Sequence, residues 1–268
     1  MPLTEDLIDK RLNEHEMLPV FNRLFGGADG YTFILMGDCP LEDLKPYIEK
    51  YLGGLPHGKV HTEYCFSRRP LKAGNDSLVS YTGDSPKASV TLIYQRDLPV
   101  DDFRSFTLKS NVMAAVLRSR LLKSLREEMG KVYSVSVSSS AGKYPSFLSR
   151  TAIGFVCAPQ DVDTLLATIR QELETLLQRH PDAYADILKD VKHNLLKEYA
   201  LNRQRNSFWT SQIRNAVFNR EEDWEGIRSY PQEVERLTMA ELSAFARQLL
   251  QKASLTKAIL YPRKGLKE

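Results

Sequence analysis

Histidines, the side chains that most often bind a catalytic zinc, are few in this sequence and badly spaced. A helical zinc pair needs two histidines four residues apart, so that both imidazoles leave one helical face. His57 and His61 have that spacing but flank a stretch rich in glycine and proline, so they would not share a helical face. Arg11 to His15 reads Arg-x-x-Glu-His, which resembles an inverted zinc motif with arginine in place of the first ligand. A guanidinium stays protonated and cannot bind zinc, so we predict no metal site in this chain.

The cysteines and the common catalytic motifs give no site either. The sequence holds three cysteines far apart and no CxxC pair, so neither a disulfide framework nor a zinc knuckle is indicated. Cys65 and Cys157 lie in apolar stretches, where we expect buried thiols that act as small hydrophobic groups. No GxSxG, P-loop or GxGxxG motif is present. The sequence therefore shows no self-sufficient active site.

The composition indicates a globular protein without a nucleic-acid partner. Of the residues, 42% are hydrophobic and 26% are charged, which is ordinary for a soluble domain. The 37 basic and 34 acidic residues leave a net charge of +3, whereas a dedicated nucleic-acid binder is expected to be strongly basic. No apolar run approaches the roughly 18 residues of a membrane span. The polar, acidic first residues predict no signal peptide.

The hydrophobic pattern predicts an α+β fold, with helices packed on one face of a mainly antiparallel sheet. The predicted strands cover residues 31–36, 60–66, 78–82, 87–96, 132–141, 147–157 and 255–261. The predicted helices cover residues 5–25, 41–52, 103–129, 161–179, 181–205, 208–218 and 238–251. The stretch Gly54 to Lys59 is rich in breakers and is interpreted as a linker.

A faint internal repeat suggests two related units. Aligning Phe21 with Phe245 also matches Arg23 with Arg247 and Thr32 with Thr256, and it superimposes a helix, a polar turn and an apolar strand. Such units are common, so chance similarity is the alternative. If the repeat is real, the chain begins with the end of one domain and continues through a second copy.

Three patches resemble the pitrilysin/insulinase family of zinc peptidases. The first is Leu-Arg-Glu at residues 125–127 followed by Gly130 and Tyr133, within residues 118–137. The second, residues 51–56 (YLGGLP), resembles the family's domain-ending segment, and the third, residues 31–37, resembles the strand that precedes it. The order of elements matches over nearly the whole chain.

The resemblance implies a LuxS/MPP-like metallohydrolase architecture, in which four homologous α+β domains form two halves that close around a peptide. Zinc and the general base belong to the first domain, and the later half lends an arginine and a tyrosine to the bound peptide. By position these are Arg126 and Tyr133. An arginine fork suits substrate carbonyl or carboxylate oxygens, and a phenol can donate to an oxygen near the developing oxyanion.

The implied protein is the non-catalytic C-terminal part of a bacterial zinc metalloendopeptidase. Its partners would be a peptide substrate and the N-terminal catalytic half of the same polypeptide, which would carry the zinc, while this chain would bind none. The expected domains are 1–56 as the tail of a preceding homologous domain, 57–59 as linker and 60–268 as a complete domain. A periplasmic location is expected from the family alone.

Several alternatives stay open at this point. Tyr133 shares a predicted strand face with Val135 and Val137 and could be a core residue. Arg126 could pair with Glu127, Glu128 or a neighbouring helix. The chain could also be a non-catalytic family member that assists a separate catalytic subunit, or a stand-alone peptide-binding module.

Overall fold

The structure is a computed structural model that describes residues 4–11, 13–58, 74–144, 146–178, 184–221 and 224–263. The chain divides into two compact units, which are described one at a time. Unit 1 comprises residues 1–67 and 205–215, and unit 2 comprises residues 68–204 and 216–268. The predicted strand 60–66 lies outside the described residues, as does much of the stretch around it.

Unit 1 is built from short helices. They are α1 (Glu5–Arg11), η1 (Glu14–Glu16), α2 (Met17–Phe25), α3 (Leu41–Tyr47), the π-helical turn η2 (Ile48–Leu52) and the first part of α7 (Asn206–Asn219). The single helix predicted over 5–25 is wrong, because the Asn13 side chain accepts a hydrogen bond from the His15 N–H and starts a new helix there. Asparagine is a preferred N-cap residue for this reason.

The strand predicted over residues 31–36 is also wrong. This segment forms no strand in the structure, and four of its large apolar side chains are exposed (Tyr31, Phe33, Leu35 and Met36). An extended segment becomes a strand only when its N–H and C=O groups find a partner. No other described segment pairs with residues 31–36, so the apolar pattern has no sheet to join here.

Unit 2 contains a five-stranded sheet with the order β1-β5-β2-β4-β3. Its strands are β1 (Asn75–Gly83), β2 (Ala88–Asp97), β3 (Val132–Gly142), β4 (Leu148–Cys157) and β5 (Ser254–Pro262). All neighbours are antiparallel except β1 and β5, which run parallel. The predicted, mainly antiparallel α+β fold is therefore confirmed.

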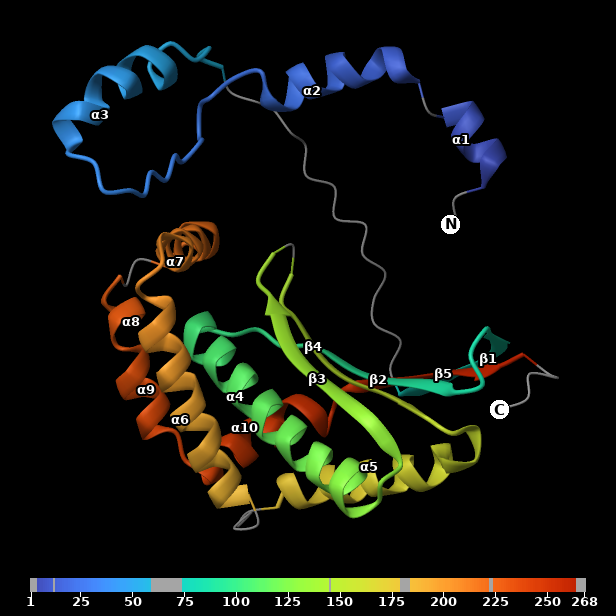
Figure 1. The fold of residues 1–268 in the computed structure, drawn as a ribbon. Coiled ribbons are helices and arrows are strands. Elements are labelled where there is room, and N and C mark those ends of the chain that lie inside the picture. Colours follow the sequence, from blue (N-terminus) through green and yellow to red (C-terminus); the bar gives the residue numbers. More distant parts are fainter. Residues whose placement is uncertain are drawn as a thin grey trace. The chain divides into compact units, whose positions relative to one another are not determined.

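Helices cover one face of this sheet (Figure 1). The helices of unit 2 are α4 (Phe103–Leu122), the π-helical turn η3 (Lys123–Glu128), η4 (Pro159–Asp161), α5 (Val162–Leu176), α6 (Ala185–Asn202), α8 (Glu225–Arg228), α9 (Tyr230–Arg236) and α10 (Met239–Leu250). Of these, α4 and α10 contact the strands, while α6 packs on α4 and α9. The long helix predicted over 103–129 thus changes to a wider turn after Leu122. The short helices α8 and α9 were not predicted.

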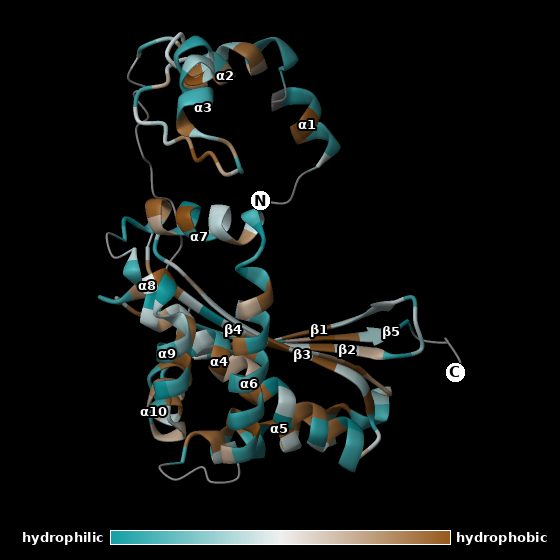
Figure 2. Ribbon diagram, turned by 60° about the vertical axis from the view of Figure 1, so that its left-hand side comes forward, coloured by the Kyte–Doolittle hydropathy of each residue, from teal (hydrophilic) through white to brown (hydrophobic). Residues whose placement is uncertain are grey.

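The core lies between the sheet and these helices (Figure 2). Along β4, odd-numbered residues from Ser149 to Cys157 are buried and their even-numbered neighbours are not, as expected for a sheet covered on one face. Helix α4 supplies the facing side chains, including Val116, Leu117 and Leu121, which have no exposed surface. Burying each such leucine or valine stabilises the fold by about 1.5–3 kcal/mol.

Candidate functional site

The end of α4 is shaped by a π-helical turn and a glycine. In η3 the Met129 N–H bonds the Ser124 carbonyl at 3.2 Å, a longer reach along the chain than in an α-helix. Gly130 has φ +67°, and the following Lys131 N–H bonds the Leu125 carbonyl at 3.1 Å. A glycine in the left-handed region is the usual way to end a helix and turn the chain sharply. Leu125, fully buried, anchors the turn so that Arg126 lies at the surface.

The start of β3 presents Tyr133 to solvent. The register between β3 and β4 shifts between Val132 and Val135, and both valines are buried. A bulge of this kind interrupts the alternation of side chains along a strand. Tyr133 lies between them with 83% of its surface exposed, so the alternative of a core tyrosine is wrong.

Arg126 and Tyr133 meet across the turn. The Arg126 Cζ lies 5.7 Å from the centre of the Tyr133 ring, within the range of a cation–π contact. Glu128, one alternative partner of Arg126, pairs instead with Arg120 at 3.2 Å. The structure therefore brings the two predicted site residues together on one exposed surface. Their contact with a peptide stays a prediction.

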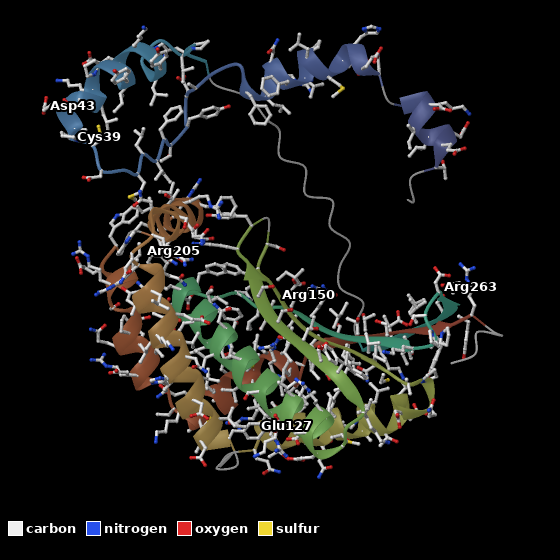
Figure 3. The ribbon with its side chains drawn as sticks, in the orientation of Figure 1. Cys39, Asp43, Glu127, Arg150, Arg205 and Arg263 are labelled. Carbon is white, nitrogen blue, oxygen red and sulfur yellow. The ribbon has the colours of Figure 1, made fainter. Side chains whose placement is uncertain are left out.

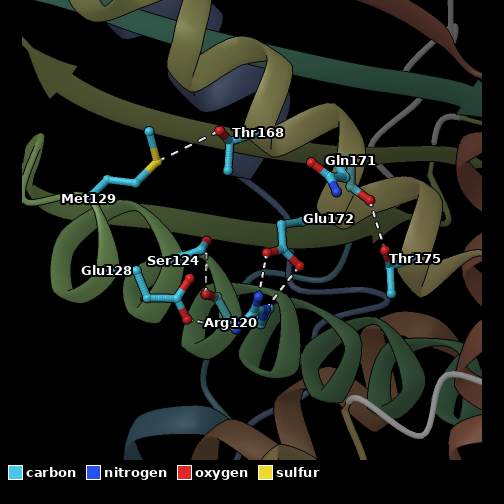
Figure 4. A pocket seen from close by; sticks show the side chains of 8 residues that line it. All are labelled: Arg120, Ser124, Glu128, Met129, Thr168, Gln171, Glu172 and Thr175. Atoms are coloured by element: carbon cyan, nitrogen blue, oxygen red, sulfur yellow. Dashed lines mark hydrogen bonds and ion pairs between the residues drawn. The ribbon is translucent and has the colours of Figure 1, made fainter.

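A polar network links α4, η3 and α5 beside this turn (Figure 4). Arg120 donates a hydrogen bond from Nε to Oε2 of the Glu172 carboxylate at 2.9 Å, and its Nη2 forms an ion pair with Oε1 at 2.8 Å. The buried Tyr184 hydroxyl donates to Glu172 Oε2 at 2.8 Å. The bond to Glu172 raises the pKa of Arg120, and burial raises the pKa of the Tyr184 phenol. The arginine therefore stays charged, and the phenol stays a neutral donor.

This network borders a cavity of about 280 Å³ between η3 and α5. The lining residues are Arg120, Ser124, Glu128, Met129, Thr168, Gln171, Glu172 and Thr175. The charged groups in it already bind one another, and Thr168 Oγ1 lies 3.7 Å from Met129 Sδ. We interpret the side chains that line the cavity as the contacts that hold η3 against α5. Because Arg126 belongs to η3, these contacts also help to set its position.

The motifs in the sequence do not indicate this network, although the hydrophobic pattern of α5 carries one signal of it. The apolar face of α5 carries Val162, Leu165, Ile169, Leu173 and Leu176, and all of them are buried. Glu172 falls on the same face of the helix, and a carboxylate there requires a cationic or hydrogen-bonding partner. The pattern could have predicted a buried ion pair but not which arginine completes it.

The histidines and cysteines form no metal site within the described ranges. There, no group of three or more His, Cys, Asp and Glu side chains could hold a metal ion. His57 lies 3.5 Å from Asp29 on the surface, while His61 is outside the described ranges. Cys39 is exposed near the start of α3 (Figure 3). Cys157 is buried as predicted, and burial raises the pKa of its thiol to about 11.

A match to a protein-family model identifies the family of this chain. The model described as the peptidase M16 inactive domain matches residues 21–195, well over half of the chain. The chain belongs to the peptidase M16 family. This finding confirms the resemblance to pitrilysin/insulinase peptidases that the three sequence patches indicate. No curated protein matches the sequence.

Solved structures of M16 proteases share the fold. The periplasmic protease PqqL from Escherichia coli is 19% identical, with a TM-score of 0.78 over 97% of this chain and 28% of its own length. The first half of PqqL, solved separately, is 17% identical, with a TM-score of 0.65 over 85% of this chain and 50% of that one. An M16 inactive domain from Pseudomonas fluorescens is 17% identical, with a TM-score of 0.72 over 96% of this chain and 60% of that one. The chain thus spans less than two thirds of these relatives.

Proposed function

We propose that this M16 inactive domain helps to enclose a peptide and holds it for a zinc site on an N-terminal catalytic half of the same polypeptide. The observation that carries the proposal is the pair formed by Arg126 and Tyr133, exposed side by side at 5.7 Å. Membership of an inactive peptidase domain supports the pairing with a catalytic half. The zinc and the general base would belong to that half, and this chain would bind no zinc.

The geometry of the pair suits a peptide backbone. Tyr133 is 83% exposed, so its hydroxyl is accessible as a donor to a peptide carbonyl. Stacking against the phenol ring restricts the Arg126 guanidinium, whose remaining donors can bind carbonyl or carboxylate oxygens. The π-helical turn and the bulge fix where the two side chains leave the backbone.

The test is peptide hydrolysis by the whole protease that contains this chain. We expect Arg126→Ala to lower kcat/KM by about tenfold to a hundredfold, because a hydrogen bond to a charged group contributes about 1.5–3 kcal/mol. Tyr133→Phe should give a smaller loss. Zinc content should be unchanged in both variants. Arg228→Ala is the matched control, since Arg228 is an equally cationic, exposed residue on α8, and we expect it to keep full activity.

Two results would contradict the proposal. Unchanged peptidase kinetics in both site variants would remove the substrate role and favour a purely assembly-related function. Zinc-dependent proteolysis by the purified 268-residue chain would show that the catalytic metal belongs to this part.

No described helix is long and apolar enough to cross a membrane. A periplasmic location, as in PqqL, is part of the proposal, and cell fractionation tests it.

A further inference from the structure

One face of the sheet in unit 2 is covered by none of the described helices (Figure 1). The odd-numbered residues of β4 from Ser149 to Cys157 are buried on the helix side, so the even-numbered ones point to the opposite face. The strand registers extend this open face across β2, β3 and β5. Away from the strand ends, it carries serine, threonine, glutamine, alanine, glycine and aliphatic residues, and one charged residue, Arg150.

So few charges are unusual for a surface in water. Charged residues make up 26% of the sequence, and nearly all such residues belong on solvated surfaces. Surfaces that bind another chain are instead depleted in lysine, glutamate and aspartate and enriched in arginine and tyrosine. Among the described strand residues, the acidic ones on the open face lie only at its margins, Asp97 at the end of β2 and Asp76 in the edge strand β1. The open face therefore has the composition of a binding surface.

Arg150 is the charged residue of the open face, and its charge is not neutralised there. The side chain is exposed (Figure 3), and Gln95 of β2 and Ser140 of β3 lie opposite it in register. In the described parts of the chain no ion pair or side-chain hydrogen bond involves Arg150, whereas Arg104 and Arg120 each bind a carboxylate. An arginine offers a planar fork of donors that fits a carboxylate. The Arg150 guanidinium is thus available to an acidic group from outside the sheet.

Strand β3 connects Arg150 with the proposed peptide site. Tyr133 lies near the start of β3, and Ser140, the register partner of Arg150, follows seven residues later. Seven residues of extended chain span roughly 23 Å, and an extended peptide beside β3 has the same rise per residue. Between them Ser136 and Ser138 are exposed and carry no charge. A peptide held at Tyr133 can therefore reach Arg150 with a side chain about seven residues away.

We propose that Arg150 is a specificity-determining residue that binds an aspartate or glutamate side chain of the peptide substrate. The acidic residue lies about seven residues along the peptide from the residue held by Arg126 and Tyr133. Substrates with a carboxylate at this distance are bound more tightly than neutral ones, because the guanidinium has no carboxylate of its own within the described chain. The inference rests on the proposed function, since one peptide occupies both places.

The experiment measures hydrolysis of paired peptides by the whole protease that contains this chain. Each pair shares one neutral sequence, amidated at its C-terminus, with a single glutamate or glutamine placed at successive distances from the cleaved bond. We expect kcat/KM to favour glutamate by about threefold to tenfold at a distance of about seven residues, through a lower KM, and less as salt is added. Because each ratio compares two peptides in one enzyme, a loss of folding or of the Arg126–Tyr133 contact cancels from it.

Three variants of Arg150 carry the test. Arg150→Gln should bring the glutamate-to-glutamine ratio to about one, and Arg150→Lys should keep part of it, because the charge stays but the fork is lost. Arg150→Glu should reverse the preference, so that lysine at the same distance is favoured over glutamine. Arg236→Gln is the matched control, at an exposed arginine of α9, and should keep the ratio of the parent enzyme.

The ratios also decide against the proposal. An unchanged ratio in Arg150→Gln, or an equal loss in Arg236→Gln, would overturn the role of Arg150. A glutamate preference that is the same at every distance would overturn it as well, because it would indicate attraction by overall charge and not a subsite. Failure of the proposed function gives a different result, in which Arg126→Ala leaves kcat/KM unchanged for both peptides of every pair.

Discussion

At the scale of single residues, the candidate site rests on a network of buried and half-buried polar groups. Arg120, Glu172 and Tyr184 join α4, α5 and the start of α6 through charge-assisted hydrogen bonds. Glu172 is 8% exposed, so its charge is satisfied by protein rather than by water. These residues touch no proposed substrate, but they hold the helix end from which Arg126 projects.

Removing the carboxylate at the centre of this network should destabilise unit 2. We expect Glu172→Ala to lower the free energy of unfolding by about 2 kcal/mol, because it removes the shorter ion pair of the half-buried Arg120 guanidinium and leaves it with the exposed Glu128. Tyr184→Phe should cost about 1 kcal/mol through the lost hydrogen bond. Chemical denaturation followed by circular dichroism measures both. Glu174→Ala, at an exposed position of the same helix, is the control and should stay within about 0.5 kcal/mol of the parent.

At the scale of elements, the turn between α4 and β3 decides where the site residues point. A π-helical turn, a left-handed glycine and a strand bulge follow one another within about a dozen residues. Each departs from regular geometry, and each persists because the flanking Leu125 and Val135 are fixed in the core. The site is therefore specified by packing on both sides of the turn.

Gly130 gives a direct test of this turn. Gly130→Ala should cost about 1–2 kcal/mol, because φ +67° is unfavourable for a residue with a Cβ, even though the space beside it is open. We also expect a loss of the contact between Arg126 and Tyr133, visible as a chemical-shift change of the tyrosine ring. Gly142→Ala, in the same unit but without a positive φ, should change neither quantity appreciably. A stable variant with unaltered ring shifts would show that the glycine does not set the site.

The sequence predicted the elements of unit 2 better than those of unit 1, and for a physical reason. In unit 2 the hydrophobic period matches a core that exists within the chain, so the strands at 88–97 and 148–157 lie within two residues of prediction. Residues 31–36 carry an equally good strand pattern but pair with no strand among the described residues. The family motif indicates Arg126 and Tyr133 as candidate site residues, and the structure brings them together. The exposure of Tyr133 could not be predicted from the sequence. The bulge between Val132 and Val135 turns the side chain to solvent, and the pattern of apolar and polar residues does not reveal a bulge.

At the scale of the whole molecule, the two units differ in how their stability is distributed. Unit 2 has a continuous core that includes the strands, α4, α5 and α10. Unit 1 has a single buried residue among those described. Regions with few buried apolar contacts open at much lower free energy than a packed core. The predicted division at 57–59 stays a prediction, although the contact units separate nearby, at residue 67.

The reactivity of two cysteines tests whether the two units differ in packing. In alkylation at pH 8, the exposed Cys39 of unit 1 should react at once, and the buried Cys157 of unit 2 only after denaturant unfolds the core. The pKa of Cys157 is raised from 9.0 to about 11, so its protonated thiol favours the folded state. That contribution is complete below pH 9 and is lost as the pH rises towards 11. Peptide mass mapping assigns each modified cysteine. Equal rates at both sites in native buffer would contradict a packed unit 2.

The position of β5 also sets the order in which the sheet can be completed. β5 lies between β1 and β2, yet of the five strands it is the last to be synthesised. Until residues 254–262 leave the ribosome, β1 lacks its only described neighbour, and β2 lacks one of its two neighbours. Strands β2, β4 and β3 can pair before then, but the five-stranded sheet cannot be completed. It must wait for its final residues, and a ribosome that stalls before them would release a chain with an open, aggregation-prone sheet.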